Sequence, residues 1–448
     1  GDVYKRQMEV HSLNFSKILK KYLFSLIDEM GQNHALYTRN PNHDFSRIKK
    51  WSFSKTLLCT LSIGAGSLNS ELLKFFYFDP NMPTLSSFIQ RRAQILPSAF
   101  EHLFHAFNAF DKGYKTIYGY RPLAIDGSSV MLPYDPTNES TLRKSGKSNE
   151  YNVTHLSCLF DLKKRIYIDA KIQPIHKKDE HKALQYMVDQ YNGPANTIFI
   201  MDRGYECYNS IAHIEQKGMY YIIRAKDPSS HGIAASVKNQ LPDEDTFDVN
   251  TSFYISKKKT TDVKKHPELY KRIRSKQTFD FFTEESTYYP MKIRIVRFHL
   301  TETTCETILT NLPTEITAEI LKELYHMRWG IETSFRELKY TIGLNAFHSK
   351  NYDFILQEIW SRLLLYNFCE MITAKVAISQ KANRVYGYQV NFTNAIFICR
   401  KFFIAKEQKS PPDVEKLIQR ELLPIRLGRS FPRNLKSRPT ANFIYKIY

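Results

Sequence analysis

Hydrophobic and polar positions repeat with helical period between residues 324 and 342. Apolar side chains recur every three or four residues, so at about 100° per residue they share one face and predict an amphipathic helix. This apolar face consists of Leu324, Met327, Ile331, Phe335, Leu338 and Ile342.

A stripe of polar side chains follows the edge of this buried face. It spans about 60° on the helical wheel, and it consists of Tyr325, Arg328, Glu332 and Lys339. An aromatic hydroxyl, two cations and a carboxylate are therefore expected at the border of the core instead of in open water. Because cationic side chains bind phosphate, the stripe suits a site that holds phosphate beside a metal-binding carboxylate.

Two short apolar runs each end in an aspartate, Asp126 in the first and Asp202 in the second. Such runs next to glycine are typical of buried strands. If the two strands are parallel neighbours, both carboxylates emerge at the same carboxyl edge of the sheet, where α/β proteins place their sites. Together with Glu332 they would repel one another, and a hard divalent cation such as Mg²⁺ relieves that repulsion.

The order of the elements around these aspartates predicts an α/β fold. Three strands, a helix, a strand, a helix and a strand follow one another, which is the order of an RNase-H-like core. The predicted strands cover residues 122–126, 153–161, 165–173, the run that ends at Asp202, and 219–225; the helices cover 180–191 and about 208–217.

Residues 45–115 have helical spacing and predict an α-helical region before this core. A short helix that Pro97 ends contains Arg91 and Arg92. These arginines suit a helix-turn-helix-like DNA reader. They suit equally well an ordinary helical bundle that exposes them to solvent.

Residues 227–312 interrupt the core before the helix of Glu332. A basic stretch over residues 257–276 holds nine Lys or Arg against Asp262 and Glu268, and it can be a DNA contact or a solvated loop.

Strands are predicted near 291–298 and 305–311, and a long apolar helix over about 352–378. The tail after Pro424 is basic and has no acidic residue.

Composition points to a polyanionic partner. Lys and Arg total 64 against 45 Asp and Glu among 448 residues, a net charge of +19, which favours nucleic acid. No long apolar segment predicts a membrane span. The six cysteines are far apart without a Cys-x-x-Cys pair, as expected of reduced thiols. The first seven residues, before Met8, have no structural pattern and are expected to be a non-native leader.

Four other acidic residues compete for the metal-binding role. Glu323 and Glu337 fall about 160° and 120° around the helical wheel, among polar neighbours, and are expected to be solvated. Asp161 and Asp169 lie on the predicted hairpin strands and are weaker candidates than the two aspartates that end apolar runs.

These motifs together resemble the DDE transposases of bacterial insertion sequences, specifically the insertion-sequence-four group. The resemblance covers the chain from about residue 45 to its end. It is carried by Asp126, by Asp202 within Asp-Arg-Gly-Tyr, and above all by the Tyr-Arg-Glu-Lys spacing beside Trp329 and Phe335, preceded by Leu-Thr-Asn-Leu-Pro.

The resemblance implies an insertion-sequence transposase that performs metal-dependent DNA cleavage at the element ends and strand transfer into target DNA. Two Mg²⁺ ions, which Mn²⁺ can replace, would serve as cofactors. The catalytic residues and metal ligands would be Asp126, Asp202 and Glu332. The DNA phosphates would be bound by Tyr325, Arg328 and Lys339.

The implied partners are double-stranded DNA, as terminal inverted repeats and as target, and a second copy of the chain in a synaptic complex. The implied location is the bacterial cytoplasm, at the nucleoid. Two alternatives stay open: a catalytically silent, domesticated DNA-binding protein of the same fold, and a structure-selective nuclease without strand transfer.

The expected fold class is α/β: an RNase-H-like catalytic core with a β-rich insertion, an α-helical N-terminal domain and a mostly helical C-terminal region. The corresponding division of the chain is a leader over residues 1–7, a helical N-terminal DNA-binding domain over 8–118, the catalytic domain over 119–226 plus 313–380, the insertion over 227–312, and a C-terminal helical region with a basic tail over 381–448.

Overall fold

The structure, a computed structural model, describes residues 15–47, 50–145, 148–273, 277–284, 287–376, 378, 386–405 and 413–425. The leader predicted over residues 1–7 and the basic tail after Ile425 lie outside these ranges. Within them, none of the helices combines the length and the apolar character that crossing a bilayer requires.

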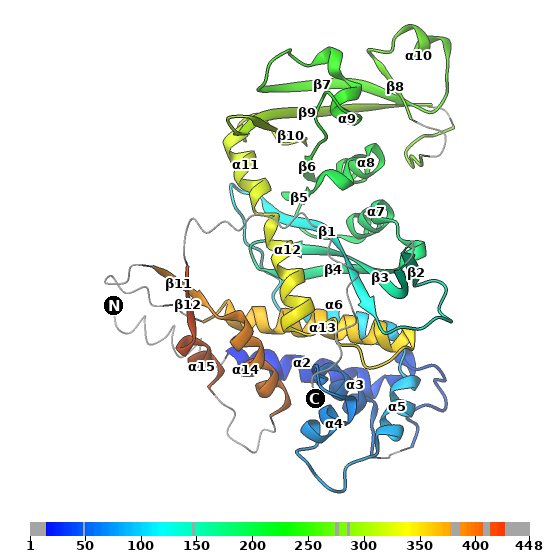
Figure 1. Ribbon diagram of the computed structural model, residues 1–448, viewed down its shortest axis with the longest axis vertical. Helices are drawn as coiled ribbons and strands as arrows, with labels where there is room; N and C mark the ends of the chain where they lie inside the picture. The colour runs from blue at the N-terminus through cyan, green and yellow to red at the C-terminus, as the bar shows by residue number, and fades with distance from the viewer. Residues whose placement is uncertain are drawn as a thin grey trace.

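A long mixed sheet with helices on both faces forms the centre of the molecule (Figure 1). Its strands are β1 (Arg121–Leu132), β2 (Leu142–Ser145), β3 (Ser148–Asp161), β4 (Ile166–Pro174), β5 (Thr197–Met201), β6 (Tyr220–Arg224), β7 (Phe247–Ser256), β8 (Tyr270–Arg272), β9 (Tyr288–Thr301) and β10 (Thr304–Thr310). A separate two-stranded sheet pairs β11 (Gly387–Val390) with β12 (Leu422–Ile425).

The helices occupy three stretches of the chain, one before the sheet, one between its strands and one after it. They are α2 (Phe15–Gln32), α3 (Phe53–Ser62), α4 (Leu68–Phe75), α5 (Leu85–Gln94), α6 (Pro97–Asn108), α7 (Glu180–Gln190), α8 (Tyr208–Gln216), α9 (Ile233–Ser236), α10 (Thr261–Lys265), α11 (Ala318–His326), α12 (Trp329–Arg336), α13 (Tyr352–Thr373), α14 (Phe392–Ile404), α15 (Val414–Arg420), the short turns η1 (His34–Tyr37), η2 (Ile175–Lys177), η3 (Arg203–Tyr205) and η4 (Lys238–Gln240), and the π-helical segment η5 (Glu337–Thr341).

The predicted strand and helix order of the core is confirmed, and the structure gives its topology. Strands β1, β3 and β4 form an antiparallel meander, and β5 and β6 then run parallel to β1. Strand β1 extends beyond the predicted residues 122–126, because β3 pairs with it as far as Leu132 after β5 has ended.

The segment expected to form a β-rich insertion continues this sheet instead of starting another one. Strand β10 pairs with β6, and β9 and β7 follow in order toward the far end of the molecule (Figure 1). The described part of the basic stretch over residues 257–276 lies at this end, around α10 and β8.

Strand alternation sorts the core into layers. Leu123 and Ile125 pack on α7 and α8 on one face, whereas Ala124 and Val130 pack on the other face with α6, α12 and α13. The N-terminal helices join this second layer, since Leu19 and Leu57 belong to the same apolar cluster. Helices α11 and α12 run along this face toward α13 (Figure 1).

Arg92 contradicts both expectations for the arginines of α5. Its side chain is 1% exposed, so it neither contacts DNA nor faces solvent. The guanidinium donates to the side chains of Gln357 and Glu358 at 2.8 and 3.1 Å, and to the carbonyl oxygen of Phe354. A buried helix bundle can hold this charge because every one of these partners comes from α13.

We predict that this pair makes the fold sensitive to acid. Burial alone would raise the pKa of Glu358, but the charge of Arg92 and the hydrogen bond from His348 lower it to about 2. The stabilisation is therefore complete above the ordinary pKa of 4.5 and is lost as the pH falls from there toward 2. Glu358→Gln should destabilise the protein by about 3–5 kcal/mol at pH 7 and flatten this part of the pH profile in urea unfolding. An unchanged profile would contradict the assignment.

Candidate active site

The parallel register of β1 and β5 brings two aspartates side by side. The last pair of this register is Ile125 with Met201, and Asp126 and Asp202 are the next residue on each strand. Neighbouring strands lie about 4.8 Å apart, so the two carboxylates meet at the carboxyl edge of the sheet as predicted. Asp202 also caps η3, where its Oδ1 accepts the backbone N–H of Gly204 at 2.8 Å.

The predicted helix over residues 324–342 is not uniform. Between α11 and α12 the backbone N–H groups of Arg328, Gly330 and Ile331 each donate to the carbonyl three residues earlier, at 2.9–3.1 Å. These tighter turns separate Tyr325, which packs over β6 and β9, from Glu332, which lies near Asp126 of β1. After Arg336 the helix widens into η5.

Arg328 connects the helix to the sheet. Its Nη2 donates to Oε1 of Glu332 at 2.6 Å, and its Nη1 contacts Oδ2 of Asp126 at 3.4 Å. The side chain of Arg328 is 8% exposed, so the ion pairs are shielded from water. The predicted stripe and the predicted strand end therefore meet in one place.

The pKa of Asp126 depends on its burial and on the charged groups around it. Burial is the largest cause and raises this pKa to about 6. The hydrogen bond from the N–H of Gly127 and the charge of Arg328 lower it, whereas the charges of Asp202 and Glu332 raise it. Asp202 and Glu332 thus both lie within electrostatic range of Asp126.

Tyr325 and Arg328 carry unused hydrogen-bonding groups. The hydroxyl of Tyr325 and Nε of Arg328 are buried and make no hydrogen bond of good geometry with the described residues. Both residues line a cavity of about 550 Å³, whose wall also includes Arg224, Glu306 and the half-exposed ring of Trp329. The hydroxyl of Tyr325 lies beside the guanidinium of Arg328 itself, and this pair of donors at the wall of a cavity suits an anionic ligand.

Lys339, the last residue of the stripe, reaches back to β1 from η5. Its Nζ donates to Oγ of Ser128 and to the carbonyl oxygen of Ser129, each at 2.7 Å. Burial lowers the pKa of this ammonium group. Arg328, Glu332 and Lys339 therefore lie beside β1, whereas Tyr325 packs over β6 and β9, and Lys339 binds protein oxygens in the structure.

The expectation that Glu337 is solvated is wrong. Its carboxylate pairs with Arg165 at 3.3 Å and accepts the hydroxyl of Tyr366 at 3.0 Å. Burial raises the pKa of Glu337, and the charge of Arg165 lowers it. The helical wheel gave its direction correctly, but α13 and the β3–β4 turn cover that side of the helix.

The other competing carboxylates lie outside the group around Asp126. Glu323 is exposed as expected and accepts the hydroxyl of Tyr118 at 2.5 Å. Asp161 is fully buried and pairs with Arg121 at 2.8 Å, whereas Asp169 lies 3.4 Å from His105. Each of them has a local partner of its own.

Sequence reasoning missed the residues behind β1. His155 on β3 is 2% exposed, and its Nε2 lies 3.0 Å from Oε1 of Glu180 at the start of α7. The hydroxyl of Tyr205 is buried without a hydrogen bond to the described residues, and its pKa is raised by burial and then by the charges of Asp126, Glu180 and Asp202. In the sequence, the one signal for these residues is Gly127, because a glycine inside a strand indicates that another part of the chain approaches closely.

The chemistry of the carboxylates suits a divalent cation. Asp126, Asp202 and Glu332 offer oxygen ligands, which Mg²⁺ prefers. In the described part of the chain, however, no three or more His, Cys, Asp or Glu side chains are arranged as the ligands of a metal ion. Two of these carboxylates pair with Arg328 instead.

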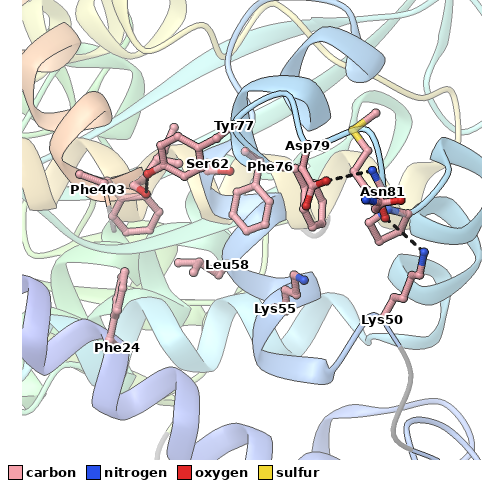
Figure 2. Close-up of a pocket in the computed structure, with 15 residues that line it drawn as sticks. Phe24, Lys50, Lys55, Leu58, Ser62, Phe76, Tyr77, Asp79, Asn81 and Phe403 are labelled. Atoms are coloured by element: carbon pink, nitrogen blue, oxygen red, sulfur yellow. Dashed lines mark hydrogen bonds between the residues drawn. The ribbon is translucent and has the colours of Figure 1, made fainter. Parts of the chain in front are cut away.

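A second cavity lies in the helical bundle and involves none of these groups. Figure 2 shows it lined by Phe24, Leu58, Phe76 and Phe403, with Lys55 beside the rings; its volume is about 520 Å³. All of its lining residues come from the N-terminal helices, their loops and the end of α14. It lacks the convergent carboxylates of the sheet edge.

Comparisons with known proteins agree with the geometry. The model of a family described as transposase DDE domain matches residues 117–368. The chain is similar to the transposase InsG for insertion sequence element IS4 from Escherichia coli (strain K12), at 31% identity over 129 residues, 26% of this chain. That similarity spans only 28% of the relative's length.

A solved structure is similar over a longer stretch. It is the piggyBac transposase synaptic complex with hairpin DNA, studied by cryo-EM. The similarity has 10% identity and a TM-score of 0.46, and it covers 93% of this chain and 87% of that one.

We predict that Gly127 is required for the packing behind β1. A Cβ atom there would lie 2.4 Å from Nε2 of His155 and 2.6 Å from Oε1 of Glu180. Since His155 is buried, Gly127→Ala should destabilise the protein by about 1–3 kcal/mol, measured by denaturant unfolding. Gly113→Ala is the control, because its Cβ would meet only Oδ1 of Asp111 at 3.3 Å. Equal stability of the two variants would contradict this prediction.

Proposed function

Since the chain belongs to the family of proteins with a transposase DDE domain, we propose that it is an insertion-sequence transposase that cuts DNA at the element ends and joins them to target DNA. The observation that carries this proposal is the position of Arg328 between Asp126 and Glu332, beside Asp202. Three carboxylates and a buried guanidinium at one sheet edge suit chemistry at a phosphodiester.

Asp126, Asp202 and Glu332 are proposed to hold a divalent metal, as two Mg²⁺ ions that Mn²⁺ can replace. When bound, such ions activate the attacking oxygen and stabilise the leaving oxygen at phosphorus. The proximity of the three acids supports this role: burial is the largest cause of the raised pKa of Asp126, and the charges of Asp202 and Glu332 raise it further, a repulsion that a bound cation would relieve.

Arg328 is proposed to exchange partners when DNA arrives. Its guanidinium matches a phosphate as well as it matches a carboxylate, since both accept its forked donors. A phosphate in the adjacent cavity could also accept from Tyr325, whose hydroxyl has no partner of good geometry in the described chain. Lys339, whose ammonium group has a third N–H beside the two that bond Ser128 and Ser129, would contribute a point charge to the strand from this position.

The fold and domain division remain part of this proposal. We propose that β1, β3, β4, β5 and β6 with α7 and α8 form an RNase-H-like core, on the basis of strand order 4-3-1-5-6. The helical region over residues 8–118 is proposed to bind DNA. Residues 227–312 are proposed to act as a β-rich extension of the sheet.

The proposed partners are terminal inverted repeats, target DNA and a second copy of the chain in a synaptic complex. The net charge of +19 supports DNA as a partner. The alternative is a catalytically silent DNA-binding protein of the same fold. The half-buried Asp126 argues against it, because carboxylates crowded for no function would weaken the fold.

We predict metal-dependent strand cleavage. The substrate is a plasmid that carries the DNA flanking the coding region on both sides. Cleavage and joining should require Mg²⁺ or Mn²⁺ and stop with chelator, and Asp126→Asn, Asp202→Asn and Glu332→Gln should each lower the rate at least about 100-fold. Gel shift should show that these variants still bind DNA.

Asp189→Asn is the matched control, because this exposed carboxylate pairs with His213 on the far helix layer. It should cleave at the wild-type rate. DNA binding without strand breakage in any divalent ion would favour the silent DNA-binding protein. Cleavage that never yields joined ends would favour a nuclease.

We further predict that Lys339 contributes one phosphate contact. Each such contact changes the slope of log affinity against log salt concentration by about one. Lys339→Ala should therefore bind DNA more weakly at low salt and show a slope that is shallower by about one, measured by fluorescence anisotropy. An unchanged slope would remove Lys339 from the DNA-binding residues.

A further inference from the structure

Glu337 belongs to a polar cluster on the side of the helix that faces away from the carboxylates. Arg165 pairs with Glu337 at 3.3 Å and with Glu370 at 3.1 Å, and the hydroxyl of Tyr366 donates to both acids at 3.0 and 3.3 Å. Glu370 and Tyr366 lie on α13, whereas Arg165 lies in the β3–β4 turn. Glu337 is thus attached to two elements that are independent of its own helix.

The first residue of η5 is Glu337 itself. From here the helix is wider: the N–H of Ile342 donates to the carbonyl of Glu337 at 2.9 Å, five residues earlier, and the N–H of Leu344 donates to that of Leu338 at 3.0 Å, six residues earlier. Leu338 and Ile342 are fully buried. Such π-helical turns are rare and are often found at functional sites.

The widened turn determines where Lys339 points. Lys339 is the third residue of this turn. An extra residue in one turn shifts the phase of the residues that follow it by about 100°, so in a regular α-helix Lys339 would be turned by part of that angle, away from Ser128. The turn before it is also fixed, because Oγ of Ser334 and the hydroxyl of Tyr167 lie 2.9 Å apart. At the point where the widening begins, the described part of the chain has one ion pair, that of Glu337 with Arg165.

We infer that Glu337 is a positioning residue for Lys339: its ion pair with Arg165 and its hydrogen bond from Tyr366 hold the π-helical turn that places the Lys339 ammonium on Ser128, two residues from Asp126. This role rests on the proposed function only in so far as Lys339 serves DNA. The placement itself is a property of the free protein.

The charge of Glu337 is the essential element. A glutamine would fill the same volume and could still accept from Tyr366, but it would leave Arg165 paired with Glu370 alone. The cluster would then no longer bind the start of η5 to the β3–β4 turn. Glu337→Gln therefore tests the tie with little change in packing.

The experiment measures the exposure of Lys339 without DNA. Free protein is treated with an amine-reactive ester, and mass spectrometry of peptides gives the labelling rate of each lysine. In Glu337→Gln the rate at Lys339 should rise several-fold, because Nζ no longer stays on Ser128 and the carbonyl of Ser129. The rate at Lys217, which donates to the carbonyl of Asp189, should not change.

Two further variants separate positioning from general loosening. Arg165→Gly removes the other half of the ion pair at a turn residue with φ of 58°, which glycine adopts readily, and it should raise Lys339 labelling as well. Asp353→Asn breaks a different, partly exposed ion pair on α13, that with Arg39, and should not. Labelling that stays at the wild-type rate in both Glu337→Gln and Arg165→Gly would overturn the inference, as would an equal rise in Asp353→Asn.

The salt dependence of DNA binding then tests whether the position of Lys339 matters for its proposed phosphate contact. Glu337→Gln and Lys339→Ala should each reduce the slope by about one, and the double variant also by about one. A double variant that loses about two would overturn the inference, because Glu337 would then act on its own. If wild type does not bind DNA, the proposed function fails, while the labelling result still decides the positioning role.

Discussion

A buried guanidinium is the constraint on which the site depends. Arg328 pairs with one carboxylate from the sheet and one from its own helix, and it is the charge that lets acidic side chains gather in a largely dry place. Removing a single partner from such a group is costly, because the remaining charge stays buried. The helix is consequently held at a fixed position on β1. The tight turns before Glu332 and the wide turn after Arg336 set the directions of the side chains at that position.

Under the proposed function, the same side chains give the site its reactivity. A guanidinium that satisfies two carboxylates in the free protein can satisfy a phosphate instead, and the released carboxylates then suit a divalent cation. Lys339 is likewise paired with oxygens of the protein, because its ammonium group donates to Ser128 and to the carbonyl of Ser129. Under the proposed function, the resting protein keeps its phosphate-binding groups in place by pairing them with its own oxygens.

Much of the core could be predicted because its periodicities are strong. The apolar runs before Asp126 and Asp202 predicted strands, and the parallel pairing that brings the two together is confirmed. The helical stripe predicted that Arg328 and Glu332 share a face. Charge and spacing also led to the transposase resemblance, which the family match confirms. What these patterns share is that each is local, or rests on the simple rule that parallel strands end at one edge.

The misread residues were those whose neighbours come from distant parts of the chain. Arg92 and Glu337 both looked like surface charges, because a helical wheel gives the direction of a side chain and not what covers it. α13 buries Arg92 and partly covers Glu337; its contacting residues come more than 250 residues after Arg92 and about 30 after Glu337. A charge that is buried in this way needs a partner of opposite sign, and α13 supplies one in Glu358 while the β3–β4 turn supplies the other in Arg165. The long apolar helix therefore does more than fill the core: it fixes the charged residues of the helices that cross it, and through η5 it reaches the site at the sheet edge.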